Sequence, residues 1–88
     1  MSVVAFPSQV LTPEEMTMIA ARVEHAGHYR CVSADAAGGP PAIALLNGER
    51  QVRGRIVKRH GVFHVLDARG FPVLRSRRLE DVLATLTK

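Results

Sequence analysis

The fold of this chain is decided by the stretch AIALLNGERQVRGRIVKRHGVFHVLDARGFPVLRS, residues 42–76, in which short runs of β-forming residues alternate with turn signals. The runs cover residues 42–46, 50–59, 62–66 and 71–75. The turns fall at Asn47-Gly48, at His60-Gly61 and at residues 67–70. An Asn-Gly pair between apolar runs is the strongest short signal for a two-residue hairpin turn. Because short connections join antiparallel neighbours, we expect a meander of strands.

Two residues inside these runs carry further information. Gly54 lies within the second run, where a glycine indicates a bulge or a close approach of two backbones. Pro72 lies in the last run and has no N–H to donate to a neighbouring strand, so we expect that strand at an edge of the sheet.

A helix precedes the strands. Thr12 can cap its first turn, Pro13 suits the first helical position, and Glu15 stands three residues after the cap, as a capping box requires. Apolar residues then recur at helical spacing as far as Ala26, and Gly27 ends the helix. Alternation over residues 28–32 predicts a further strand, and residues 35–41 predict a loop.

A second helix follows the strands. Ser76 is expected to cap it, and Glu80 and Asp81 lie in its first turn, where negative charge suits the helix dipole. Its apolar stripe comprises Leu79, Val82, Leu83 and Leu86. The fold class is therefore α+β: an antiparallel meander of about four or five strands with both helices packed on one face, in the order α-β-β-β-β-β-α.

The composition is that of one small globular domain. Of the 88 residues, 47% are hydrophobic and 23% are charged, a balance typical of folded proteins. Only 5% are aromatic, so the core is thin and mainly aliphatic, and a homodimer is one way to bury more apolar surface. We expect one domain over residues 1–88, with residues 1–11 as an extended or partly disordered segment.

The chain is expected in the cytoplasm. Its one cysteine, Cys31, cannot form an internal disulfide, whereas small secreted domains usually rely on several. The first residues lack a basic leader, and Pro7 interrupts their apolar stretch, so no signal peptide is expected. No run approaches the roughly 18 apolar residues of a membrane span, so no membrane partner is expected.

Charge is concentrated in one part of the chain. Residues 1–48 carry a net charge of −2, residues 49–78 carry +7, and residues 79–88 carry −1. Alternation along a strand would place Arg53, Arg55 and Arg59 beside Val57 on one sheet face, with Val52, Ile56 and Lys58 on the other. Arg75, Arg77 and Arg78 fall where the last strand meets the closing helix.

These six arginines form the candidate site. The arginine fork suits bidentate contact with phosphate or base edges, so we expect a non-enzymatic regulatory or accessory protein that binds RNA or DNA. Two alternatives stay open: ordinary surface charge, and a protein-interaction module that meets an acidic protein partner. Interleaved aromatic side chains would favour single strands or RNA, but Phe63 and Phe71 are expected in the core.

The order of elements and the stretch GFPVLRSRRLEDVLATL, residues 70–86, resemble double-stranded-RNA-binding domains, which run helix, three strands, helix. In that family basic residues lie where the second helix begins, and Ser76, Arg77 and Arg78 match this position. Glu80 and Asp81 follow where the family usually continues with Ala and Lys, and the run 42–46 adds a strand that the family lacks.

Other chemistry receives less support from the sequence. His60 and His64 lie near the arginines and suggest a third function, a histidine-dependent ribonuclease of the kind found in toxins whose fold resembles the same domains. His25, His28 and Cys31 lack the paired spacing of a metal site, and we expect no metal. No nucleophile elbow or glycine-rich phosphate loop is present in the sequence, and no cofactor is expected.

Overall fold

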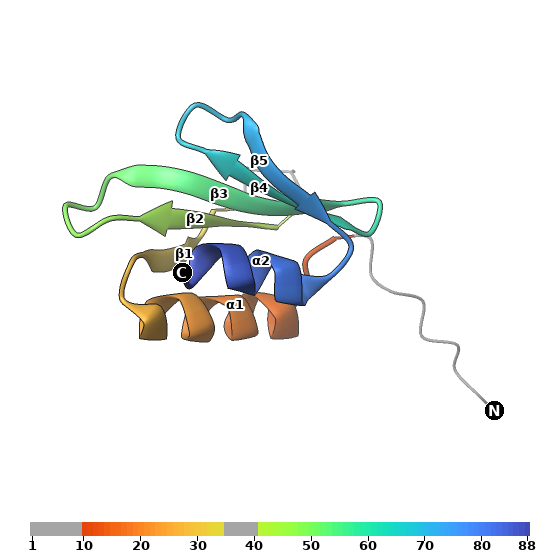
Figure 1. Cartoon of the computed structure of the whole chain (residues 1–88), viewed down its shortest axis with the longest axis horizontal. Coiled ribbons are helices and arrows are strands. Elements are labelled where there is room, and N and C mark those ends of the chain that lie inside the picture. Colours follow the sequence, from red (N-terminus) through yellow and green to blue (C-terminus); the bar gives the residue numbers. More distant parts are fainter. Residues whose placement is uncertain (1–9, 35–40) are drawn as a thin grey trace.

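The computed structural model describes residues 10–34 and 41–88, and within these ranges it shows two helices and five strands (Figure 1). The elements are α1 (Pro13–Ala26), β1 (Arg30–Ser33), β2 (Ala42–Leu46), β3 (Val52–Arg59), β4 (Val62–Asp67), β5 (Pro72–Ser76) and α2 (Leu79–Leu86). The strands form one antiparallel sheet in the order β1-β2-β3-β4-β5, which is a meander. The expected α+β fold is confirmed.

Both helices lie on the same face of the sheet, and the hydrophobic core fills the space between them and the strands (Figure 1). The sheet contributes its alternate residues to this core, and the helices contribute their apolar stripes. The buried core residues are Leu11, Ile19, Val23, Ile43, Leu45, Ile56, Phe63, Val65, Val82 and Leu86. Within residues 10–34 and 41–88, no helix covers the opposite sheet face.

The start of α1 follows the local signals closely. The hydroxyl of Thr12 accepts a hydrogen bond from the Glu15 amide at 3.1 Å, and the Glu15 carboxylate accepts one from the Thr12 amide at 3.0 Å. Leu11 is 2% exposed and lies directly before the cap, so it belongs to the core. Residues 1–9 of the expected N-terminal segment lie outside the described residues, as do residues 35–40 of the expected loop. At the other end, Gly27 caps the helix with φ +84°.

The turn between β2 and β3 differs from the expected two-residue hairpin. The side-chain oxygen of Asn47 accepts hydrogen bonds from the amides of Glu49 and Gln51, at 2.8 and 3.0 Å. These bonds close a longer turn in which Arg50, and not Gly48, has a positive φ, of 63°. The prediction was wrong because the Asn47 side chain stabilises an alternative turn. In contrast, His60 and Gly61 have φ values of 53° and 78°, as a two-residue hairpin turn requires.

Both a β-bulge and a close approach of two backbones, the features expected of a glycine within a strand, are found at or next to Gly54. The register between β2 and β3 shifts next to it, since Leu45 pairs with Gly54 but Leu46 pairs with Val52. A Cβ atom at position 54 would lie 2.7 Å from the carbonyl oxygen of Leu66 on β4. Gly54 therefore lies next to a bulge, whose extra residue is Arg53, and is also a point of close backbone approach.

The closing helix begins later than expected. Its N-cap is Arg78, whose side chain makes no capping hydrogen bond. The hydroxyl of Ser76 instead donates to the Asp81 carboxylate and accepts from the Arg78 amide at 3.0 Å. Ser76 lies within β5, where it pairs with Phe63, and its hydroxyl accepts the amide of the N-cap residue Arg78 instead of an amide of the first turn. The expectation that β5 is an edge strand is confirmed.

One charged side chain enters the core side of the sheet. Lys58 is 5% exposed, and its ammonium lies 2.9 Å from the Glu15 carboxylate and 4.7 Å from the centre of the Phe63 ring. This contact ties β3 to the first turn of α1. Of the two helices in the described ranges, neither is long and apolar enough to cross a membrane.

Candidate nucleic-acid interface

The helix-free face of the sheet carries most of the candidate site. On β3, the residues that alternate with buried Ile56 and Lys58 point away from the core, and cross-strand pairing aligns them with His64 and Leu66 on β4. His64 pairs in turn with Arg75 on β5. We use the term open face for the set Arg53, Arg55, Val57, Arg59, Val62, His64, Leu66, Val73 and Arg75.

Four of the six candidate arginines lie on this open face. Arg55 and Arg59 alternate with core residues along β3, Arg53 is the extra residue of the bulge next to Gly54, and Arg75 lies two strands away on β5; all four are exposed. Of the described carboxylates, none lies within 4.0 Å of these four guanidinium groups. Their charge is therefore unpaired within the described residues.

The other two arginines lie beyond the face. Arg77 is in the bend between β5 and α2, and Arg78 is the N-cap of α2. The Arg78 guanidinium lies 4.0 Å from the Glu80 carboxylate, with both side chains at least 75% exposed. Glu80 and Asp81 place negative charge in the first turn of the helix. The helix start is therefore a weaker anion site than the open face.

His64 lies among the arginines of the open face. It is half-buried between Val57 on β3 and Arg75 on β5. Burial lowers the pKa of its imidazole below the ordinary value of 6.5, and the charges of Arg59 and Arg75 lower it further. His60 is exposed in the β3–β4 turn, outside the strands. Among the described residues, the charged groups that act on His64 are thus the cations Arg59 and Arg75.

A small hollow opens at one end of the open face, between the start of β3 and the β4–β5 turn. It has a volume of about 140 Å³ and is lined by the turn residues 67–70 together with Val52, Arg55 and Leu66. We refer to it as the turn hollow. Val52 was expected on the core side, but the register shift beside Gly54 ends the simple alternation, and Val52 is 41% exposed.

The aromatic expectation was half right. Phe63 is buried in the core at 2% exposure, whereas Phe71 is 64% exposed. The Phe71 backbone is held by Asp67, whose amide donates to the Phe71 carbonyl at 2.8 Å and whose carboxylate accepts from the Phe71 amide at 2.9 Å. The turn over residues 68–70 reverses the chain before β5 begins, and Phe71 lies between this turn and the strand, outside the core. An exposed aromatic residue therefore directly follows, in the chain, the turn residues that line the hollow.

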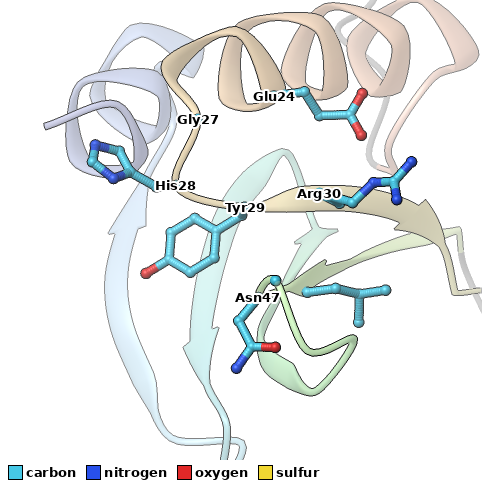
Figure 2. Close-up of a pocket in the computed structure, with 8 residues that line it drawn as sticks. Glu24, Gly27, His28, Tyr29, Arg30 and Asn47 are labelled. Carbon is cyan, nitrogen blue, oxygen red and sulfur yellow. The ribbon is translucent and has the colours of Figure 1, made fainter.

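A second cavity lies at the end of the sheet where α1 stops (Figure 2). It has a volume of about 370 Å³, and its lining includes Glu24, Tyr29, Arg30 and Asn47. Its polar groups serve the fold: the Glu24 carboxylate accepts the Cys31 amide at 3.2 Å, and Asn47 closes its own turn. In Figure 2 the Arg30 side chain extends along the β1 ribbon on the side of Glu24.

The histidines and the cysteine near this cavity do not assemble a metal site. In the described part of the chain, no three His, Cys, Asp or Glu side chains converge as metal ligands. Burial raises the pKa of the Cys31 thiol to about 11, and the nearby Glu24 charge adds to the effect. The thiol is therefore protonated at neutral pH and is a poor nucleophile.

No protein-family model, curated protein or solved structure matches this chain. Among the described residues, the open face and its turn hollow combine positive charge that has no described carboxylate within 4.0 Å, exposed apolar surface and a cavity.

Proposed function

We propose that this protein binds nucleic acid through the open face, with Arg53, Arg55, Arg59 and Arg75 as its phosphate contacts. The observation that carries the proposal is that these four guanidinium groups lie on a sheet face without a described helix, and no described carboxylate lies within 4.0 Å of any of them. An unpaired cation cluster on a rigid sheet attracts polyanions and meets them at little conformational cost.

The spacing of the arginines along β3 supports a polymeric ligand. Residues on one face of a regular strand repeat every two positions, roughly 6.6 Å apart, so Arg55 and Arg59 are about 13 Å apart along the strand, and Arg53 at the bulge extends the row. A nucleic-acid strand carries one phosphate for roughly every 3.4 Å of its helix axis. Several phosphates of one strand therefore fall within reach of the row, and Arg75 reaches a neighbouring position across the sheet.

The same charge makes self-association through this face unfavourable. A symmetric sheet-to-sheet dimer would bring two sets of four arginines together, and like charges in contact oppose binding. An acidic protein partner remains the second candidate for this surface, since it would use the same cations. The salt dependence and the choice of ligand separate the two.

The test is a titration of fluorescently labelled single-stranded and duplex DNA and RNA, measured by anisotropy at 50 and 200 mM salt. With four phosphate contacts, the affinity for a duplex should fall about 100-fold between these salt concentrations. The double variant R55Q/R59Q should bind at least tenfold more weakly at 50 mM salt and show a smaller salt slope. The control is R22Q, which removes an exposed arginine of α1 on the helix side and should leave binding unchanged.

Two results would overturn the proposal. One is the absence of binding to any of the four nucleic acids at 50 mM salt. The other is an equal loss of affinity in R22Q and R55Q/R59Q, which would indicate attraction to the net charge of the chain rather than to the open face. Capture of a polyglutamate peptide in place of the oligonucleotides would favour the acidic protein partner.

A further inference from the structure

We infer that the turn hollow accepts an unpaired nucleobase, so that the open face selects single-stranded nucleic acid. This inference rests on the proposed function and adds the class of ligand. It is carried by the place of the hollow on the arginine-bearing face, by the apolar side chains of Val52 and Leu66 in its lining, and by the exposed Phe71, which directly follows the lining residue Gly70 in the chain.

The size of the turn hollow suits one planar ring system. Its volume of about 140 Å³ corresponds to roughly four or five water molecules at about 30 Å³ each. Pockets for drug-sized ligands are larger, at about 300–1,000 Å³. A base that remains paired in a duplex presents only its edge in a groove, so a cavity of this size is filled only by a base that leaves the stack.

The lining offers the contacts that an unstacked base requires. Val52 and Leu66 provide apolar surface, and Arg55 and Arg69 provide guanidinium planes on which bases stack. Arg55 belongs both to the hollow and to the arginine row on β3. A strand whose phosphates follow that row therefore brings a base to the hollow without a change of direction.

The β4–β5 turn is held in place before any ligand arrives. The Asp67 carboxylate oxygen Oδ1 accepts the amides of Arg69 and Phe71, each at 2.9 Å, and Gly70 adopts φ +90°. A carboxylate has about four acceptor sites, so Asp67 retains capacity to accept an amino group on a base edge. The hollow is thus preorganised, which lowers the cost of binding.

Phe71 supplies a second stacking surface. It follows Gly70, the last lining residue of the hollow, and at 64% exposure it is the most exposed large hydrophobic side chain in the described ranges. An exposed ring on a pinned backbone is unfavourable in water but is well suited to stack on a base next to the one in the hollow.

The experiment compares three labelled ligands at 50 mM salt: a single-stranded oligonucleotide, an oligonucleotide of the same length with abasic sites, and the duplex. The abasic strand keeps the phosphates and lacks bases, so it isolates the contribution of the hollow. Wild-type protein should bind the ordinary single strand at least tenfold more tightly than the abasic strand. The variants F71A and R69Q should each bind the ordinary strand at least fivefold more weakly. F71A should also leave the affinity for the abasic strand unchanged.

The matched control is M18A, which removes another exposed apolar side chain, from α1 at 48% exposure, and should not alter any affinity. Far-UV circular dichroism of each variant checks that the fold is intact. Equal binding of ordinary and abasic strands, or tighter binding of the duplex, would overturn the unpaired-base inference while leaving the proposed function in place. Failure of all three ligands to bind would overturn the proposed function itself.

Discussion

Replacing Glu15 with glutamine leaves the Lys58 ammonium buried without a counter-charge, and this single change is expected to cost a large fraction of the stability. The Lys58 side chain is 6% exposed and the Glu15 side chain is 22% exposed. Glutamine keeps an oxygen that can accept the Thr12 amide, so the capping box survives and only the charge is lost.

The magnitude follows from the burial of each partner. Removing one partner of a buried ion pair costs roughly 3–5 kcal/mol, and because Glu15 is partly exposed and glutamine still accepts a hydrogen bond, we expect about 2–4 kcal/mol for E15Q. We expect about 1–2 kcal/mol for K58M, since the Glu15 carboxylate keeps its bonds with Thr12 and its favourable place at a helix N-terminus. A domain of this length has a total stability of roughly 4–13 kcal/mol.

The double variant E15Q/K58M distinguishes burial from simple attraction. It contains no uncompensated charge, and methionine fills the space of the lysine stem, so we expect it to lose only about 0–1 kcal/mol. Urea unfolding at pH 7, followed by far-UV circular dichroism, gives the four free energies of unfolding. The control is E14Q, in the same helical turn but exposed, which should change stability by no more than about 0.5 kcal/mol.

The pair also predicts a dependence on pH. Burial raises the pKa of the Glu15 carboxyl, but the hydrogen bonds from Lys58 and Thr12 and the Lys58 charge outweigh burial and hold that pKa below its ordinary 4.5. The stabilisation is therefore present above pH 4.5 and is lost as the pH falls through the folded-state pKa. As the pH falls below 4.5, wild-type protein should lose the part of its free energy of unfolding that comes from the Glu15 carboxylate, and E15Q should not. A smaller cost for E15Q than for K58M, or additive single costs in the double variant, would refute the reasoning.

Two further changes are expected to act locally. G54A should destabilise the protein by about 2–3 kcal/mol in the same urea assay, because its Cβ would lie 2.7 Å from a backbone carbonyl oxygen of β4. The control is G48A, where the added Cβ meets open space and should change stability by less than about 1 kcal/mol. Equal effects of the two would contradict the close approach. The charges of Arg59 and Arg75 help to lower the pKa of the His64 imidazole, and a phosphate bound to the open face beside His64 would offset them. Binding should therefore take up a proton, and the affinity should increase as the pH falls from 7.5 to 5.5. This pH dependence should be weaker in H64Q, and an unchanged dependence would exclude His64 as its source.

Features that depend on near neighbours in the chain were predictable. The capping box joins residues three apart, and the His60-Gly61 turn needs only its own two positive φ angles. The antiparallel meander followed from short connections. The failures were also local: at Asn47 and at Ser76, a side chain had two backbone partners within reach, and the sequence signal did not show which it would take.

The sequence alone determined the α+β order of elements and the concentration of arginine in residues 49–78, because periodicity and charge are properties of the chain itself. Only the tertiary structure decided that Arg75 shares a face with Arg55 and Arg59, since this depends on the register between strands. The same is true of Val52 and Phe71, which bulge and turn geometry place on the surface. Register and bulges are set by contacts between strands rather than by the residues of any one strand, and they turn a basic sequence into a surface with a hollow.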